Sequence, residues 1–447
     1  MNKQLKIVLV GGGSVQWSPT LISDLLYTEK LEGCQYVILD IDQPAGHDMA
    51  RFGNNLARER GLNCIFEAAA SQREAFAGAD FIIITISTGG LDAMEYDLSI
   101  PEEYGILQTV GDTVGPGGWA RGLRNINVFA EMAENIEKYA PKAVVLNYTN
   151  PMATLTNIFY KNSNLRTVGL CHGLFEVYDL FQKLFGADSE EQIKIRFAGA
   201  NHFFWILDFQ VNGRDGYQLL KETLNGRRFD EVCKNDYIDE AGFGSANRVA
   251  SEMLEVTGLL PYTGDRHTSE FFPHYLTAGG ERLRQYNLVR TSISHRRKIK
   301  ADSRMALEEY LNGTRPLPEK RSRETAANII ESFITGHDFI DVMNLPNRGQ
   351  IGNLPPGSIV ETLGVANPLG FTPLHAGDLP EPALSMVLPH IANQNLIVEA
   401  GLAGNLEQAL YALYNDPLCR RLTYPEMKEM GMRLLKAHAQ YLPQFSL

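Results

Sequence analysis

The sequence is poor in cysteine, and the positions of its cysteines exclude a disulfide framework. Its 447 residues include five, an odd number. They are Cys34, Cys64, Cys171, Cys233 and Cys419. No two of them have the C-x-x-C spacing that is typical of redox and zinc sites. Any cysteine with a function is therefore expected to act as a lone thiolate.

Long apolar runs and an excess of positive charge are missing as well. No run approaches the roughly 18–20 residues that a membrane span needs. The start, MNKQLKIVLVGGGS, has no small-residue cleavage site, so we expect a first β-strand instead of a signal peptide, in a cytoplasmic protein. The formal net charge of −12 argues against nucleic acid or a membrane as a partner, but an anionic small molecule could still bind in a local basic pocket.

The first half of the chain alternates short β-branched runs with helical stretches. Five runs are predicted as strands: 5–11, 35–40, 81–87, 143–148 and 166–171. Their near-continuous apolar character is typical of parallel strands that are covered on both faces. Between them apolar residues recur at helical spacing, as in 119–140. The alternation predicts an α/β fold with a Rossmann-type, doubly wound parallel sheet.

Beyond about residue 195 the pattern changes. The segment 193–213 predicts longer, partly alternating strands, and later segments such as 393–418 predict helices. We therefore expect two domains. Residues 1–195 would form the Rossmann-type domain, and residues 196–447 a mixed α+β domain that completes its cleft.

A glycine turn separates the first predicted strand from the first helix. The Gly11-x-Gly13 spacing lets the backbone turn sharply and approach a pyrophosphate, although Gln16 stands where a third glycine is usual. Asp40 and Asp42 close the second strand, where a carboxylate can bind ribose hydroxyls and disfavours a 2′-phosphate. The pattern predicts NAD, with a tight turn of another α/β fold as the alternative. The predicted contacts are Gly11, Gly12, Gly13, Ser14, Asp40, Asp42 and Thr88.

Polar residues gather where the predicted strands end, which is where ligands of an open parallel sheet bind. Asn150 follows one strand, and Cys171-His172 follows the next. His202 lies at the end of a later apolar run. Cys171 and His202 could hold a divalent metal with positions left open for substrate oxygens, and thiolate softness by itself favours zinc. A buried structural cysteine and a structural histidine are the alternative.

Seven short motifs are spread over most of the chain. They are VGGGS at 10–14 and the segments 110–118, 147–151, 171–173, 201–205, 264–271 and 344–355. Together, and in this order, they resemble the NAD- and manganese-dependent glycosidases of glycoside hydrolase family 4. That family departs from the two-carboxylate mechanism of most glycosidases.

The resemblance implies roles for the matching residues. It makes Cys171 and His202 the metal ligands, with Mn²⁺ in place of zinc. It places His172 at the position of the proton donor, and Asn150 at that of a residue that binds sugar hydroxyls. It also implies that the protein is a homodimer or a homotetramer.

The resemblance further implies an unusual reaction. The sugar is oxidised at C3 by NAD⁺, loses its C2 proton and its leaving group, adds water and is reduced again. Asp112 matches an acidic residue that supports the base for the C2 proton. Asp265 is the first choice for that base, and Tyr275 is its rival.

The residues after Cys171 bear on the substrate. Phospho-sugar members of the family carry Asn or Asp next and a proline two positions further on, and CHGL has neither. The chain looks most like the members that act on α-uronides, so an α-galacturonide is the first choice, before α-glucuronides, α-galactosides and α-glucosides. A uronate carboxylate would suit a guanidinium, and Arg121 and Arg266 are the candidates. Salt bridges within the protein are the alternative for both.

Two other classes of function are considered. An NAD-dependent 2-hydroxy acid dehydrogenase would share the fold and the glycine turn, but it would not need Cys171 and His202 as ligands. A catalytically silent NAD-sensing regulator would not need Asp112 or Asp265. The basic run at 294–300 is predicted to be a solvated face and not a nucleic-acid site.

Overall fold

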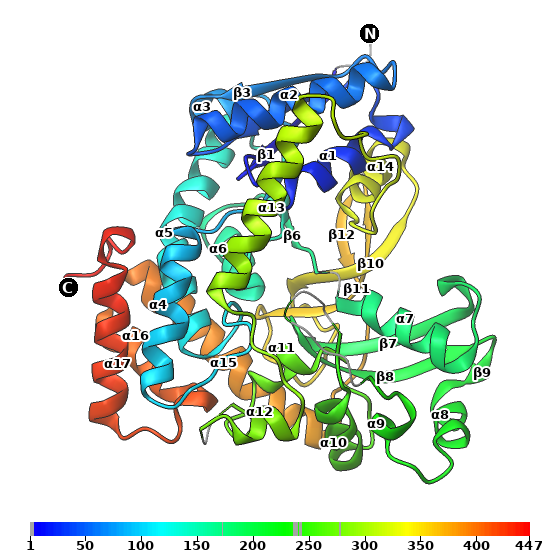
Figure 1. Cartoon of the computed structure of the whole chain (residues 1–447), viewed down its shortest axis with the longest axis vertical. Helices are drawn as coiled ribbons and strands as arrows, with labels where there is room; N and C mark the ends of the chain where they lie inside the picture. Colours follow the sequence, from blue (N-terminus) through cyan, green and yellow to red (C-terminus); the bar gives the residue numbers. More distant parts are fainter. Residues whose placement is uncertain (1–3, 172, 236–239, 241–243, 277–278) are drawn as a thin grey trace.

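One continuous sheet runs through the molecule (Figure 1). The computed structural model describes all residues except 1–3, 172, 236–239, 241–243 and 277–278. Within the described residues the sheet has twelve strands in the order β3-β2-β1-β4-β5-β6-β10-β11-β7-β8-β9, with β12 paired to β11. Its two halves differ in strand direction, and the junction between them lies at β6 and β10.

The first half is parallel throughout. Its strands are β1 (Lys6–Val10), β2 (Gln35–Leu39), β3 (Ile65–Ala69), β4 (Phe81–Ile84), β5 (Val144–Asn147) and β6 (Arg166–Gly169). The order 3-2-1-4-5-6 is that of a Rossmann sheet, so the predicted fold class is confirmed. Sequence analysis missed β3, because its residues are buried on one face only and form no continuous apolar run.

Helices cover both faces of this half, which explains why its strands are apolar throughout. Val8 and Val10 of β1 point into a core shared with α5 and α6, whereas Ile7 and Leu9 point into a second core with α1 and α2. The helices are α1 (Ser18–Leu26), α2 (Gln43–Glu59), α3 (Gln72–Phe76), α4 (Gly90–Glu103), α5 (Gly115–Tyr139) and α6 (Met152–Asn162), whereas α7 (Gly173–Phe185) follows β6 but packs on β7 and β8 of the second half. Side chains of alternating direction are thus buried on each face.

The second half extends the sheet with antiparallel strands. They are β7 (Ile193–Ala200), β8 (Phe203–Val211), β9 (Arg214–Asp215), β10 (Phe339–Pro346), β11 (Ile359–Asn367) and β12 (Gly370–Pro373). The predicted run 193–213 is broken at Asn201-His202, the two-residue turn of the β7–β8 hairpin. His202 has a φ of 62°, in the left-handed region that such tight turns use.

The remaining helices confirm the mixed α+β character of the second half. They are α8 (Gly216–Leu224), α9 (Phe229–Val232), α10 (Arg248–Thr257), α11 (Asp265–Ser269), α12 (Glu281–Gln285), α13 (Ile293–Leu311), α14 (Ala326–Thr335), α15 (Glu381–Ala403), α16 (Leu406–Asn415) and α17 (Tyr424–Ala437). Helices α15 and α17 return to pack on α5 and α4 of the first half (Figure 1). None of the described helices combines the length and the apolar character that a bilayer crossing requires.

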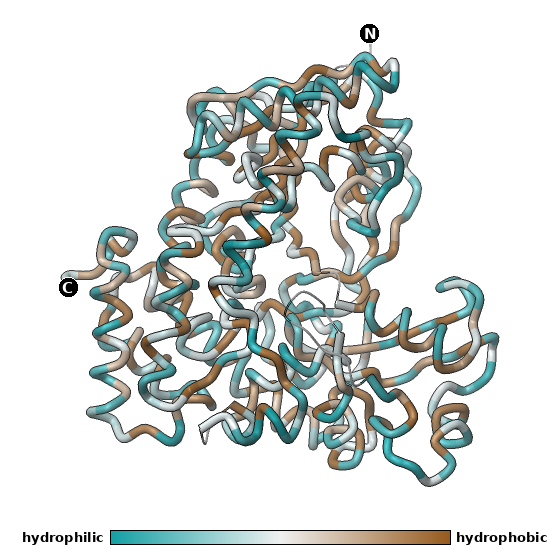
Figure 2. Tube along the Cα trace, viewed as in Figure 1, coloured by the Kyte–Doolittle hydropathy of each residue, from teal (hydrophilic) through white to brown (hydrophobic). Residues whose placement is uncertain are grey.

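Helix α13 carries the basic run and crosses the front of the molecule in Figure 1. Figure 2 shows it as largely hydrophilic, and Leu307 is its one buried residue. Arg297 bonds Asp92 and Glu95 of α4, each at 2.8 Å, and Arg304 bonds Asp48 of α2 at 2.8 Å. Arg297 of the basic run and Arg304 further along the helix therefore tie α13 to the first half through ion pairs.

Candidate functional site

The glycine turn lies at the switch point between β1 and β4. The Gly11 amide donates to the Leu39 carbonyl at 2.8 Å, and the Gly13 amide donates to Asp40 Oδ2 at 2.9 Å. Gly11 has a φ of 76°, and a Cβ there would lie 2.2 Å from the Thr85 carbonyl oxygen. Only glycine fits this position, so the turn holds β1, β2 and β4 together where a Rossmann sheet binds its dinucleotide.

The two acidic residues after β2 have different roles. Asp40 accepts the amides of Gly13 and Asp42, each at 2.9 Å, so its carboxylate is fixed against the glycine turn. Asp42 is exposed and caps α2 by accepting the Ala45 amide at 3.1 Å. Asp40 is therefore the better placed of the two for a ribose, and Asp42 serves the helix.

The other residues predicted to contact NAD lie in the same loops. The Ser14 hydroxyl accepts the Trp17 amide at 3.4 Å, at the start of α1. The Thr88 hydroxyl donates to Asn125 Oδ1 at 2.7 Å, and the Thr88 carbonyl accepts Arg124 Nε at 2.8 Å. Helix α5 therefore fixes the loop after β4.

The predicted metal ligands Cys171 and His202 both lie near Tyr262. Cys171 follows β6 and stays partly exposed, whereas His202 is 7% exposed. The Tyr262 ring is 6.1 Å from the His202 ring, and a Cβ on Gly173 would lie 3.0 Å from Tyr262 and 3.6 Å from Cys171 Sγ. Burial raises the pKa of the Cys171 thiol well above its usual value, and the Glu361 carboxylate raises it further.

A hydrogen-bond relay determines which nitrogen of His202 carries its proton. The Thr113 hydroxyl donates to Asp112 Oδ1 at 3.0 Å and lies 3.1 Å from His202 Nδ1. A hydroxyl has one hydrogen, so Thr113 accepts from the N–H at His202 Nδ1. Nε2 is then the nitrogen with the lone pair, which is the arrangement that a metal-binding histidine needs.

The donor set fits a divalent cation. It offers the Cys171 sulfur and the His202 nitrogen, and Asn201, the residue before His202, acts to lower the pKa of the thiol. The Asn201 Oδ1 atom is buried and has no partner among the described residues. No cluster of three or more His, Cys, Asp or Glu suited to a metal is found in the described part of the chain. Two protein ligands would leave positions for oxygen donors of the substrate or of water.

Basic side chains surround Asp112. Burial acts to raise the pKa of Asp112, but His267, Arg121, His202 and Arg296, in that order, hold it below its usual value. The ring of His267 lies 4.1 Å from that of His202. Asp112 is therefore ionised at neutral pH, and two of the groups that stabilise its charge are the guanidiniums of Arg121 and Arg296.

The two predicted arginines occupy different surroundings. Arg121 Nε donates to the Asn150 carbonyl at 2.8 Å, at the cis peptide bond to Pro151. Burial lowers the pKa of Arg121 to about 10, against the attraction of Asp112. Arg266 donates to the Thr291 hydroxyl at 3.1 Å. Arg121 is thus brought to Asp112 and to Asn150, the predicted sugar-binding residue.

Arg296 and Glu270 were missed by sequence analysis. Arg296 reaches in from α13 to donate to the Val110 carbonyl at 3.1 Å, and its buried Nε has no partner in the described structure. Glu270 is 1% exposed and accepts the Val110 and Gly111 amides at 2.7 and 2.9 Å, just before Asp112. Burial raises the pKa of Glu270 to about 7. The signal for Glu270 was its place in the motif at 264–271.

The two candidates for the base both bond to α10. Asp265 is 2% exposed and accepts the Val249 and Ala250 amides at 3.2 and 3.0 Å, and burial raises its pKa to about 6. The Tyr275 hydroxyl donates to Glu252 at 3.0 Å, and burial raises its pKa strongly. His172, the predicted proton donor, lies outside the described residues.

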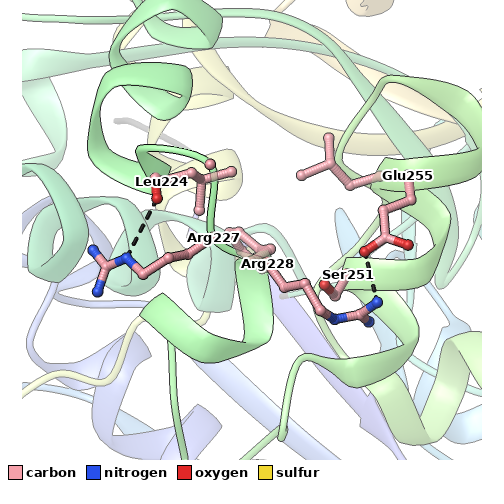
Figure 3. Close-up of a pocket in the computed structure, with 8 residues that line it drawn as sticks. Leu224, Arg227, Arg228, Ser251 and Glu255 are labelled. Atoms are coloured by element: carbon pink, nitrogen blue, oxygen red, sulfur yellow. Dashed lines mark hydrogen bonds and ion pairs between the residues drawn. The ribbon is translucent and has the colours of Figure 1, made fainter.

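A separate cavity of about 320 Å³ lies between α8, α9 and α10 (Figure 3). Its cations are already bonded: Arg228 pairs with Glu255 at 2.7 Å, and Arg227 Nε donates to the Leu224 carbonyl at 3.4 Å. None of the predicted site residues that the structure describes lines this cavity.

Two family models match most of the chain. Residues 6–187 match the family 4 glycosyl hydrolases, and residues 197–419 match the family 4 glycosyl hydrolase C-terminal domain. An α-galacturonidase from Bacillus subtilis is 35% identical over 430 residues, which cover 93% of this chain and 93% of that protein.

Solved structures show the same fold. A putative glucosidase from Bacillus subtilis matches with a TM-score of 0.88 and 32% identity over 97% of this chain and 100% of that one. A 6-phospho-α-glucosidase from gut microorganisms, crystallised with NAD and Mn²⁺, matches with a TM-score of 0.79 and 22% identity over 99% of this chain and 100% of that one. At the latter identity the likeness concerns the fold alone.

Proposed function

The chain belongs to the family 4 glycosyl hydrolases, as the sequence motifs predicted, and from this we propose that it cleaves α-glycosides of uronic acids, α-galacturonides first. NAD⁺ and Mn²⁺ are the proposed cofactors. The observation that carries the proposal is the relay from Asp112 through Thr113 to His202, next to Cys171 and Arg121. The relay connects the proposed cation ligands, Cys171 and His202, to the region around Arg121 where an anionic sugar would bind.

Bound NAD⁺ would supply a transient oxidation at C3 of the sugar, and the cation would supply Lewis-acid stabilisation of charge on the sugar oxygens. The backbone of the glycine turn, with Gly11, Gly12 and Gly13, would hold the pyrophosphate, and Asp40 the ribose. Cys171 and His202 Nε2 would hold the cation. The Thr113 hydroxyl fixes the tautomer that this requires.

Proton transfers fall to the residues that the resemblance names. His172 would hold the proton for the leaving oxygen, and Asp265 or Tyr275 would take the C2 proton. A pKa of about 6 leaves Asp265 ionised at neutral pH, whereas the raised pKa of Tyr275 keeps its hydroxyl protonated. This difference favours Asp265. The hydrogen bonds of Asp265 to α10 fix its carboxylate in place.

The charge of the pocket supports a uronate. Arg121 and Arg296 are cationic there, whereas Asp112 is the ionised acid beside them and Glu270 is partly protonated near neutral pH. A carboxylate on the substrate could pair with one of these guanidinium groups through two hydrogen bonds. Arg266 remains a second candidate for that carboxylate. The same groups suit an α-glucuronide, whereas an α-galactoside or an α-glucoside has no carboxylate to offer them.

A screen of four α-glycosides tests the proposal. The galacturonide, glucuronide, galactoside and glucoside are each supplied with NAD⁺, Mn²⁺ and a thiol reductant, and we expect the galacturonide to be cleaved fastest. Cleavage should stop without NAD⁺, although NADH does not accumulate. Cleavage that survives complete removal of NAD⁺ would contradict the mechanism, and steady NADH formation with a 2-hydroxy acid would favour a dehydrogenase. Reliance on a dinucleotide and on a reduced thiol fits the cytoplasm, and a homodimer or homotetramer remains our expectation.

A further inference from the structure

A fully buried carboxylate lies between the two strands that lead to the proposed metal ligands. Glu361 is 0% exposed and is the third residue of β11. It pairs with Asn344 of β10 on one side and with Gly199 of β7 on the other, and Asn344 pairs in turn with Gly169 of β6. These four residues form one row across the junction of the sheet.

The row has a fixed relation to the ligands. Cys171 follows β6 two residues after Gly169, and His202 follows β7 three residues after Gly199. The spacing of β6 and β7 therefore decides how far apart the two ligands stand. Strands β10 and β11 set this spacing, since they fill the gap between β6 and β7.

The side chain of Glu361 accepts hydrogen bonds from two asparagines. Its Oε2 atom accepts the Nδ2 groups of Asn201 and Asn344, each at 2.7 Å. Asn201 directly precedes His202 in the hairpin turn, and its side chain acts to lower the pKa of the nearby Cys171 thiol. The Asn201 amide thus joins the carboxylate of Glu361 to the turn that presents the imidazole, beside the thiol.

The sheet makes room for this arrangement at a cost. A carboxylate buried among strands loses its hydration, which costs free energy that hydrogen bonds or paired charges have to offset. The two end residues of the row, Gly169 and Gly199, are glycines. A Cβ on Gly169 would lie 3.0 Å from the Cβ of Asn344. An apolar residue at 361 would continue the strand without the cost, so stability alone does not account for Glu361.

We propose that Glu361 is a positioning residue, which holds the Asn201 amide and through it the placement of Cys171 and His202 for a divalent cation. The inference rests on the cation site of the proposed function. This positioning depends on hydrogen-bond geometry and not on the negative charge. One side-chain oxygen accepts two amide hydrogens, and the side-chain oxygen of a glutamine can do the same.

Cation binding by the purified full-length chain tests this role without substrate. Mn²⁺ affinity is read from the EPR signal of the free ion, and Co²⁺ is used to record the thiolate-to-metal absorption band. For Glu361→Ala we expect an affinity about 10- to 100-fold weaker and a weaker band, since residues that orient metal ligands have effects of this size. Glu361→Gln should keep both near wild type, and NAD⁺ affinity should change in neither variant.

Two further variants separate positioning from general destabilisation. Thr362→Val alters the next buried residue of the same strand, and it should leave Mn²⁺ affinity unchanged. Asn201→Ala should weaken Mn²⁺ as much as Glu361→Ala does, and the double variant should lose little more, because both break one connection. If Glu361→Ala fails to fold, Asn201→Ala and Glu361→Gln still give the comparison.

Several results would overturn the inference. These are wild-type affinity in Glu361→Ala or Asn201→Ala, additive losses in the double variant, an equal loss in Thr362→Val, or a loss in Glu361→Gln as large as in Glu361→Ala. A wild-type chain that binds neither Mn²⁺ nor Co²⁺ would overturn both this inference and the cation site. A wild-type chain that binds the cation but cleaves no glycoside would contradict the proposed function alone.

Discussion

The parallel half of the sheet and its antiparallel extension build their parts of the site in different ways. In the parallel half the backbone forms the dinucleotide turn. Gly11 and Gly13 are needed there because a Cβ at either position would collide with a neighbouring atom. In the extension, side chains form the proposed cation site: His202 in a hairpin turn, and Asn201 bonded to Glu361. Backbone sites depend on local spacing, whereas side-chain sites depend on how distant segments meet.

Cys171→Ser should have the largest effect. The exchange removes the proposed sulfur ligand next to the extension, and we expect kcat/KM for the galacturonide to fall about 10³-fold or more, because metal activation contributes several kcal/mol. The dinucleotide turn is untouched, so NAD⁺ affinity should stay at the wild-type value by fluorescence titration. Full activity in this variant would mean that the two halves do not share one site.

Glu270→Gln should change the pH dependence of stability. Burial raises the native pKa of Glu270 to about 7 from 4.5, so the native state holds a proton that the unfolded state has released. Wild-type stability should therefore decrease as pH rises from about 4.5 to 7, by up to about 3 kcal/mol from this group. The glutamine keeps the bonds to the Val110 and Gly111 amides and should remove this part of the slope. Urea unfolding of both proteins at several pH values measures it, and parallel pH profiles would refute the prediction.

Gly11→Ala should damage the backbone site alone. Its Cβ would meet the Thr85 carbonyl oxygen, and its φ of 76° is strained for alanine, so we expect a loss of about 1–3 kcal/mol in stability and weaker NAD⁺ binding. Mn²⁺ affinity should be unchanged in the folded fraction. Thermal melting with and without NAD⁺ gives both values, and equal loss of both ligands would show that the halves are coupled.

Arg296→Met should have the smallest effect and should act on selectivity. Loss of one cation near Asp112 is expected to lower the ratio of kcat/KM for the galacturonide to that for the galactoside about 10-fold. Arg297→Met is the matched control, since Arg297 pairs with Asp92 and Glu95 on the surface. Initial rates with both substrates measure the ratio, and equal changes in the two variants would assign Arg296 a structural role.

The same contrast explains what sequence analysis could predict. Strands β1, β2, β4, β5 and β6 are buried on both faces, so each leaves a local apolar run, and the glycine turn follows one of them. Strand β3 left no run, since its residues Ile65 and Glu67 are exposed. The motifs predicted one site for Cys171 and His202, and both residues lie near Tyr262.

Other site residues depend on contacts between distant segments. Arg296 was predicted to be solvated, because its neighbours on α13 are, and only the packing of α13 shows that it faces Val110. Thr113 stood inside the motif at 110–118, but its link to His202 requires the hairpin turn. Glu361 did leave a signal, as the one charged residue in the apolar strand IVETLGVAN.

The order in which the strands leave the ribosome differs from their order in the sheet. β6 ends at Gly169 and the β7–β8 hairpin at Val211. Strands β10 and β11 lie between β6 and β7 in the sheet, but they are not complete until Asn367. A nascent chain can therefore assemble its dinucleotide turn long before its sulfur and imidazole can be set at their final separation. During synthesis the nucleotide site is the early product and the cation site the late one, and a chain cut short before residue 359 would have the first without the second.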